Sequence, residues 1–333
     1  MSHDRIVVGF SGGRDSLALA AALRWVQASL GVEPVLVYVD HRLRASSAKE
    51  AMKAASLADS LALNCQMVVV SQRPTDLHPG VGVEEAARRE RYRGLFAEAA
   101  RCGARAVAMA HHRGDQAETV LLHLLRGGGV HGAAGMAERS PSPIPGNPPP
   151  RDISPEQWQC EPWLWRPLLT ESRQVIEAYV AKLGLSPIED PSNHDLALRR
   201  NALRHEVLPV LEARIPGAEA ALARYATLAA EDDRALEAVA LTLLGEGVDP
   251  GGRLATALFR EQTPAIQRRV IRGWLADCTG VSMLPAERTD AVLLLAESGR
   301  GGATLEIGEG WTVRLVRGML RAERTANQNQ ESP

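Results

Sequence analysis

The chain has 333 residues, of which 45% are hydrophobic and 23% charged, and its formal net charge is −2. This length favours two or three domains, and the composition is typical of a soluble globular protein. Apolar runs stay below the roughly 18 residues of a membrane-spanning helix, which excludes an integral membrane protein, and we expect no signal peptide. The net charge excludes a surface coated with basic residues, although a single basic face remains compatible with RNA binding.

The four cysteines, Cys65, Cys102, Cys160 and Cys278, lie far apart and form no C-x-x-C pair. This spacing argues against a zinc site, an iron–sulfur cluster or a disulfide-exchange centre. We therefore expect structural or free thiols in a cytoplasmic protein.

Short β-branched runs alternate with longer helical stretches from residue 5 to about 130. The runs RIVVGF, PVLVYVD, CQMVVV and ARAVAMA are apolar on both faces, as in buried parallel strands. Between them, residues 16–30, 47–62 and 84–102 have a helical pattern, and the first of these ends at Gly31. The alternation predicts an α/β fold with right-handed crossovers and a parallel sheet covered by helices on both faces.

The C-terminal half has a different character. Helical patterns cover residues 171–184, 198–214, 218–246 and 263–278, and the final run GGATLEIGEGWTVRLVRGMLRAER predicts two or three strands that form a β-hairpin. The turn at Ile215-Pro216-Gly217 predicts a domain boundary. We expect a catalytic domain at 1–216 with a Pro-rich loop at 138–162, a smaller helical domain at 217–325 with terminal strands, and a disordered tail at 326–333.

The run VVGFSGGRDSLALAAALRW, residues 7–25, carries the first chemical signal. Gly12 and Gly13 allow positive φ and a close approach of phosphate to the main chain, at the start of a helix that follows a strand. Ser11 and Ser16 supply hydroxyl donors. Asp15 would repel a bare phosphate, so it predicts a Mg²⁺ ion between the protein and a triphosphate. The spacing fits neither the Walker motif nor the dinucleotide-binding motif.

The second signal is AHHRGDQAETVLLHLLRGGGVHGAAGM, residues 110–136. His111 and His112 end a predicted strand, and Asp115 and Glu118 are three residues apart on one helix face. Two carboxylates and a histidine at the carboxyl end of a strand suit metal or amine binding. The segment by itself also allows a simpler interpretation, in which Asp115 only caps the helix and Glu118 faces solvent.

Together these motifs resemble a known family. FSGGRDSLAL resembles the pyrophosphatase loop of the N-type ATP pyrophosphatases (the PP-loop, adenine nucleotide alpha hydrolase-like fold), which transfer AMP and release pyrophosphate. The run HHRGDQAET, followed by RGGG and GM, is similar to the signature of tRNA(Ile)-lysidine synthetases. YVDHRLR, EEAARRERYRGL, WRPLL and EDPSNHDLALRRNALRHEVLP continue this similarity in the family's order over most of residues 5–215.

The resemblance implies a two-step reaction. The wobble cytidine O2 of an isoleucine tRNA with a CAU anticodon attacks the α-phosphate of ATP, and the ε-amine of L-lysine then displaces AMP from C2. It assigns catalytic roles to Asp15, Asp115, Glu118, His111 and Arg91, with Asp15 and Asp115 as Mg²⁺ ligands. It also implies ATP binding by Ser11, Gly12, Gly13, Arg14, Asp15, Ser16, Asp40 and His41.

For tRNA, the resemblance implies contacts from Arg88, Arg200, Asn201 and Arg204. Arg200 and Arg204, four residues apart, share a helix face that suits an RNA backbone. Simpler interpretations stay open, since RRERYR also fits a solvated helix face, and DPSN, which contains Asp190, Ser192 and Asn193, is a good turn and cap in any protein. Gly114, Gly128 and His131 depart from the family's usual residues.

Three other functions are compatible with the loop alone. A tRNA thiolation enzyme would be expected to carry paired cysteines, and a small-molecule AMP-forming synthetase would be expected to carry a glutaminase domain. A non-catalytic RNA-binding protein would not need Asp15, Asp115 and Glu118. The family resemblance also suggests a homodimer.

Overall fold

The computed structural model describes residues 4–41, 47–143, 162–189, 195–280, 285–298 and 302–325. The chain divides into two compact units, residues 1–230 and 231–333. Most of the Pro-rich loop, the turn with Asp190, Ser192 and Asn193, and the predicted tail at 326–333 lie outside the described residues. Within the described ranges, every helix is too short or too polar to cross a lipid bilayer.

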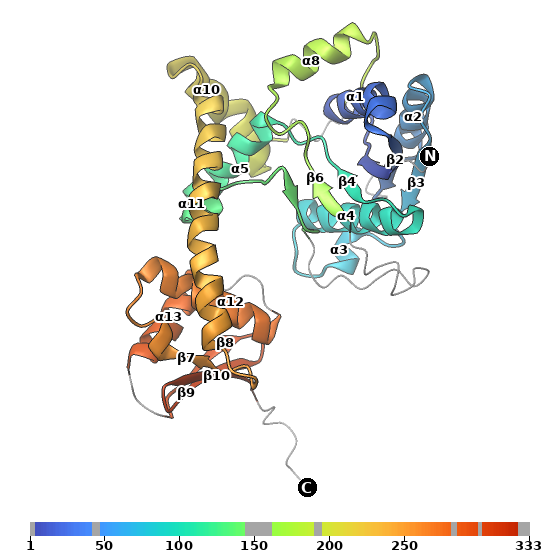
Figure 1. Cartoon of the computed structure of the whole chain (residues 1–333). Helices are drawn as coiled ribbons and strands as arrows, with labels where there is room; N and C mark the ends of the chain where they lie inside the picture. The colour runs from blue at the N-terminus through green and yellow to red at the C-terminus, as the bar shows by residue number, and fades with distance from the viewer. Residues whose placement is uncertain are drawn as a thin grey trace. The chain divides into compact units, whose positions relative to one another are not determined.

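The first unit contains a six-stranded sheet in the order β3-β2-β1-β4-β6-β5 (Figure 1). All neighbours pair in parallel except β5 and β6. Between β1 and β4 the order reverses, and open α/β sheets bind ligands at the carboxyl ends of strands beside such a reversal. The loops after β1 and β4 therefore frame the candidate site. The strands are β1 (Asp4–Gly9), β2 (Val32–Asp40), β3 (Cys65–Val69), β4 (Ala106–Ala108), β5 (Arg139–Ser140) and β6 (Trp163–Trp165).

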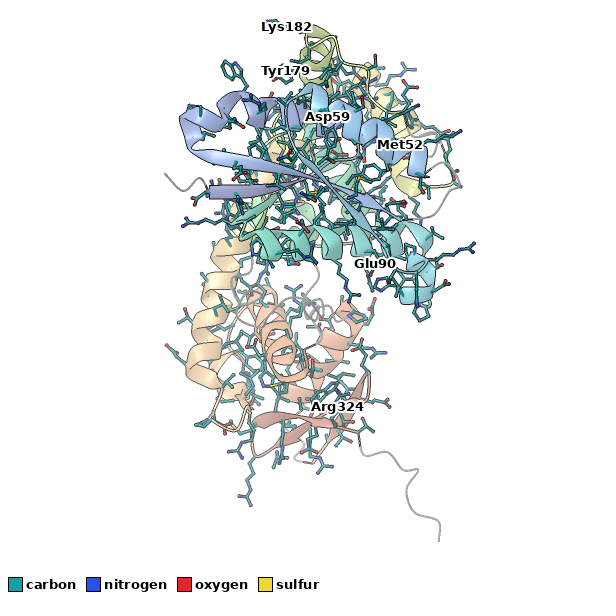
Figure 2. The ribbon with its side chains drawn as sticks, turned by 90° about the vertical axis from the view of Figure 1, so that its right-hand side faces the viewer. Met52, Asp59, Glu90, Tyr179, Lys182 and Arg324 are labelled. Carbon is teal, nitrogen blue, oxygen red and sulfur yellow. The ribbon has the colours of Figure 1, made fainter. Side chains whose placement is uncertain are left out.

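Helices cover both faces of this sheet, which confirms the predicted α/β class. One buried cluster packs α1 (Arg14–Leu30), α2 (Ser47–Ser60) and α8 (Arg173–Lys182) against the sheet. The other face is covered by α4 (Val83–Cys102), through residues such as Leu95 and Phe96. Figure 2 shows Met52 and Asp59 of α2 on one side of the sheet and Glu90 of α4 on the other.

Shorter helices complete the unit: α3 (Pro74–Leu77), α5 (Arg113–Leu125), α6 (Val130–Ala133), α9 (Arg199–Ala202) and α10 (Leu208–Arg214). The helical stretch predicted at 198–214 is confirmed in its extent, because α9, η2 (Leu203–Val207) and α10 follow one another without a gap, but η2 is a π-helical turn that interrupts the α-helical geometry. Pro209 has no N–H to donate to the carbonyl four residues back. Instead, the amide of Leu208 bonds to Leu203, five residues back, which widens the turn.

The second unit has its own core and sheet. The strands β7 (Leu254–Ala255), β10, β9 and β8 form a four-stranded antiparallel sheet in that order. The predicted hairpin is its β9–β10 pair, and two further strands extend it. The fully buried Trp274 anchors this core. The other elements are η3 (Thr256–Leu258), α12 (Pro264–Thr279), α13 (Ala286–Glu297), β8 (Thr304–Gly308), β9 (Trp311–Val316) and β10 (Met319–Arg324).

The predicted boundary at 215–217 falls at the turn between α10 and α11 (Ala218–Gly247), inside the first compact unit. The domain limits proposed from the sequence stay a prediction.

Candidate active site

The loop between β1 and α1 closes on itself through serine hydroxyls. Ser16 Oγ donates to the Gly13 carbonyl at 2.9 Å and accepts from the Ser11 amide at 3.2 Å. Ser11 Oγ accepts from the Gly13 amide at 3.3 Å. The first amides of any helix have no backbone partner within it. Gly13, which precedes α1, offers no side chain that could cap them. This geometry suits an anion at the positive end of α1.

Gly12 is needed for both its backbone and its lack of a side chain. Its φ is +73°, and a Cβ there would come within 2.5 Å of Ile188 Cδ1. We expect Gly12→Ala to lower the free energy of unfolding by about 1–3 kcal/mol and to weaken ATP binding, measured by urea unfolding and equilibrium dialysis. Adding Ile188→Val, which removes the opposing methyl group, should recover part of the stability. An unchanged double variant would contradict the packing part of this explanation.

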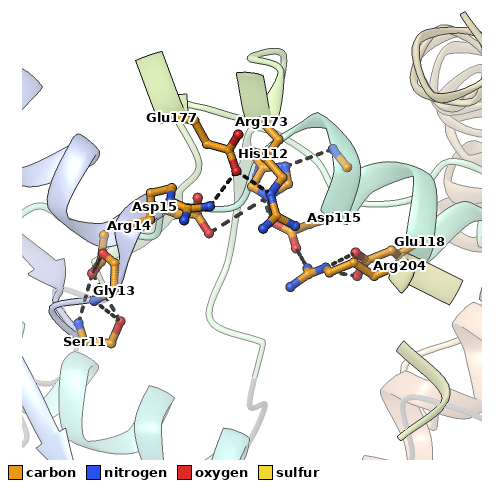
Figure 3. A network of polar contacts seen from close by, with 12 residues as sticks. Ser11, Gly13, Arg14, Asp15, His112, Asp115, Glu118, Arg173, Glu177 and Arg204 are labelled. Atoms are coloured by element: carbon orange, nitrogen blue, oxygen red, sulfur yellow. Dashed lines mark hydrogen bonds and ion pairs between the residues drawn. The ribbon is translucent and has the colours of Figure 1, made fainter. Parts of the chain in front are cut away.

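His112 joins this loop to the turn after β4 (Figure 3). Its Nδ1 accepts from the Gly114 amide at 3.0 Å, so in the neutral ring the proton is on Nε2. Nε2 lies 3.6 Å from Asp115 Oδ2 and 4.0 Å from Asp15 Oδ2. One imidazole, 3% exposed, thus faces carboxylates from two different strand ends. Burial raises the pKa of Asp15, with the nearby Asp115 adding to the shift and His112 opposing it.

Asp115 and Glu118 form the buried acidic part of the site. Asp115 is 9% exposed and Glu118 is 1% exposed, so the solvent-facing interpretation of Glu118 is wrong. Asp115 does cap α5, because its Oδ2 accepts from the His112 amide at 2.9 Å. Burial alone would raise the pKa of Asp115, but the two histidines and Arg204 outweigh it and lower the value. Burial does raise the pKa of Glu118, against the opposing charge of Arg204.

Arg204 lies elsewhere than the sequence suggested. Its guanidinium donates to Asp115 Oδ1 and to Glu118 Oε1, both at 2.6 Å, so it does not stand on an open RNA-binding face. The π-helical turn carries it toward α5. Arg200, also expected on that face, donates to Thr119 Oγ1 at 3.3 Å. Asn201 is buried and donates to the Asp195 carbonyl at 2.9 Å, which is a structural contact.

Two histidines near α4 are held neutral. The Nδ1 atoms of His41 and His111 are shielded from solvent and have no hydrogen-bond partner. Burial, aided by Arg91, lowers the pKa of His41 to about 4. Burial, opposed by Asp115 and aided by Arg166, Arg200 and Arg91, lowers the pKa of His111 to about 3. The exposed Arg91 therefore lies near both imidazoles.

These histidines predict a loss of stability in mild acid. Below about pH 6.5 the unfolded chain protonates them and the folded protein does not, so the free energy of unfolding falls with pH. Each contributes up to about 1.4 kcal/mol per pH unit, down to about pH 4. Urea unfolding at about pH 7 and pH 5 should show a flatter dependence in His41→Gln and His111→Gln. The raised pKa values of Asp15 and Glu118 have the opposite effect on stability, but they have it in wild type and in both variants alike. Equal pH dependence of the free energy of unfolding in the three proteins would therefore contradict the prediction.

Asp40, Arg14 and Arg88 make contacts outside this centre. Asp40 ends β2 and its Oδ2 accepts from Ser47 Oγ at 3.2 Å. Arg14 pairs with Glu177 of α8. Arg88 is exposed on α4, with its guanidinium 5.2 Å from the Tyr92 ring centroid.

The sequence interpretation missed His112 and Arg166 as site residues. His112 stands directly before the capping turn, and that position was the available signal. Arg166 is 6% exposed and donates to the Ala137 carbonyl at 2.6 Å, while its Nε has no partner. Gly114, where the family often carries an acid, packs against His112: an added Cβ would lie 2.8 Å from its Cε1. Glycine therefore makes room for the imidazole.

Comparisons with known proteins identify the family. A family described as PP-loop domain matches residues 1–211, and one described as TilS substrate binding domain matches residues 254–321. The tRNA(Ile)-lysidine synthase of Salinispora arenicola is 38% identical over 301 residues, which cover 89% of this chain and 84% of that protein. That of Rhodococcus jostii is 38% identical, with coverage of 95% and 88%.

Two further proteins are similar over a smaller part of their length or in fold alone. The tRNA(Ile)-lysidine synthase of Deinococcus deserti is 41% identical over 77% of this chain, which corresponds to only 43% of the longer relative. The solved structure of a U34-tRNA thiolase from Methanococcus maripaludis, with its [4Fe-4S] cluster, has a TM-score of 0.52 at 15% identity. It covers 68% of this chain and 72% of its own, and it shows the shared fold alone. On the strength of both family matches and the full-length relatives, the chain belongs to the tRNA(Ile)-lysidine synthase family.

Proposed function

We propose that this chain joins L-lysine to C2 of the wobble cytidine of an isoleucine tRNA with a CAU anticodon, using ATP and releasing AMP and pyrophosphate. The observation that carries the residue assignment is the link through His112. It brings the loop carboxylate of Asp15 together with Asp115, and through Asp115 with Glu118. The groups expected for phosphate transfer and for amine binding thus meet at the reversal in strand order.

In the first step, cytidine O2 attacks the α-phosphate and pyrophosphate leaves. The loop amides and the hydroxyls of Ser11 and Ser16 would stabilise the negative charge that develops on the phosphates. Asp15 and Asp115 suit Mg²⁺, which proteins commonly hold with one or two carboxylates plus substrate phosphates. Among the described residues no group of three or more His, Cys, Asp and Glu could hold a metal ion. The ion would neutralise charge on the triphosphate.

In the second step, the lysine amine attacks C2 and AMP leaves. Asp115 and Glu118 carry two negative charges against the single positive charge of Arg204, which leaves one negative charge for the lysine ammonium. The ammonium must lose a proton before it attacks. His111 lies close to Asp115, but burial lowers its pKa to about 3, so the imidazole is too weak a base to be that acceptor and its catalytic role stays a prediction. Arg91, near His41 and His111, would contact the nucleotide or the target base.

For the tRNA, exposed Arg88 on α4 stays a predicted backbone contact, and so does Arg200. The second unit, which matches a substrate-binding family, would supply further contacts. The homodimer stays a prediction.

The decisive experiment measures transfer of radiolabelled lysine. Purified protein is incubated with ATP, Mg²⁺, labelled lysine and an isoleucine tRNA transcript with a CAU anticodon, and the label on RNA is counted. A transcript with a changed wobble base is the control and should stay unlabelled. Incorporation of sulfur or ammonia in place of lysine would contradict the proposal.

Thiolation is the competing reaction on this fold. Cys65, on β3, has a thiol whose pKa burial raises to about 11, and burial also raises the pKa of the Cys102 thiol. A thiol that stays protonated is a poor nucleophile and metal ligand. The thiols of Cys65 and Cys102 therefore do not support sulfur transfer.

A further inference from the structure

A second group of charges lies beside the phosphate loop, between α1 and α8 (Figure 3). Arg14 Nη1 and Arg173 Nε both donate to Oε1 of Glu177, at 2.5 and 3.0 Å. The side chains of Arg14, Arg173 and Glu177 are 36%, 45% and 42% exposed, so a ligand in solution can reach them. Two guanidinium groups share one carboxylate, and one positive charge is left unbalanced within the cluster.

Helix stability does not explain these cations. Arg14 is the first residue of α1, and Arg173 is the first residue of α8. The N-terminus of a helix carries partial positive charge, which favours acidic side chains there and disfavours basic ones. Each arginine therefore lies at a helix N-terminus whose partial positive charge disfavours it, and a bound anion would offset this repulsion.

The contacts between the helix starts place this cluster at the active site. The Arg113 amide, at the start of α5, donates to the Glu171 carbonyl at 3.0 Å, just before α8. Asp15 at the start of α1 faces His112 at the start of α5, with 4.0 Å between Oδ2 and Nε2. Arg173 is also close enough to Asp15 to oppose the effect of burial on its pKa.

We propose that Arg173 is a polyphosphate ligand, which binds the terminal phosphates of ATP and then the pyrophosphate that leaves. This inference rests on the proposed function, because that function places ATP at the loop. Glu177 holds Arg173 by its Nε, which leaves both Nη groups of the planar fork available for phosphate oxygens. The same carboxylate holds Arg14 beside it, so that the two arginines line one side of the loop.

The test compares Arg173→Gln with a matched control, Arg89→Gln. Arg89 Nε donates to Glu85 Oε1 at 3.1 Å in a four-residue-spaced pair with 42% and 44% exposed side chains, away from the loop on α4. We expect Arg173→Gln to raise the Kd for magnesium pyrophosphate and the KM for ATP about tenfold or more, with the KM for lysine unchanged. Arg173→Lys, which keeps the charge without the fork, should fall between wild type and Arg173→Gln. Arg89→Gln should match wild type.

Equal pyrophosphate affinity in wild type and Arg173→Gln would overturn the inference. A tenfold loss that affects lysine as much as ATP, together with a lower thermal midpoint, would also overturn it, because it would show a structural role. A wild-type protein that binds pyrophosphate at Arg173 but transfers no lysine would support the inference and contradict the proposed function. The two failures are therefore distinguishable.

Discussion

Arg204→Met is expected to abolish lysine transfer and to lower the free energy of unfolding by about 3 kcal/mol. The guanidinium donates to two carboxylates that are 9% and 1% exposed, at 2.6 Å each. Methionine keeps most of the apolar stem but leaves Asp115 and Glu118 as adjacent buried anions without the guanidinium that they share. Urea unfolding at neutral pH measures the stability, and label incorporation measures the transfer.

A second substitution separates the two effects. Adding Glu118→Gln removes one buried charge, so the double variant should regain much of the lost stability while lysine transfer stays absent. A double variant that is no more stable than Arg204→Met would contradict the proposed charge coupling. Arg200→Met is the control, because its longer contact with the Thr119 hydroxyl predicts a loss of about 1 kcal/mol or less.

Asp15→Asn is expected to reduce pyrophosphate release by about a thousandfold or more without weakening the fold. Its carboxylate is proposed to hold Mg²⁺ against the triphosphate, and a neutral amide is a much poorer ligand for that ion. Because burial raises the pKa of Asp15 in the free protein, the charged form is disfavoured there. The amide removes this unfavourable charge, so stability should be equal or slightly higher. Release of labelled pyrophosphate measures the first effect and urea unfolding the second.

Asp59→Asn, an exposed change on α2, is the control for this prediction and should alter neither quantity. Pyrophosphate release close to wild type in Asp15→Asn would remove Asp15 from the metal site. Full loss of release together with a large loss of stability would instead assign Asp15 a structural role.

The sheet and the phosphate loop could be predicted because their signals are local. Each apolar run between residues 5 and 110 is one strand, and the glycines, serines and Asp15 follow the first strand directly. The helical period of HHRGDQAET likewise places Asp115 and Glu118 on one helix face. Such patterns require only the period of the element and the chemistry of adjacent residues.

The partners of those residues could not be predicted, because they come from distant parts of the chain. Arg204 is 86 residues from Glu118 and Glu177 is 163 residues from Arg14, so spacing carries no information about either pair. The turn that directs Arg204 toward α5 depends on the missing N–H of Pro209, which a helical pattern does not reveal. The inward position of Arg166 depends on the strand β6, whose three residues are too few for a clear period.

The antiparallel pair at the sheet edge has a consequence for how this enzyme can evolve. Ser140 of β5 lies opposite Leu164 of β6, so the chain leaves the sheet and returns to it at neighbouring positions. Residues inserted between the two strands extend a closed excursion, whose entropic cost grows only slowly with length. The loops after β1 and β4 precede this excursion in the chain and are fixed by other strands. Insertions and deletions between β5 and β6 are thus expected to accumulate in relatives without displacing a reacting group.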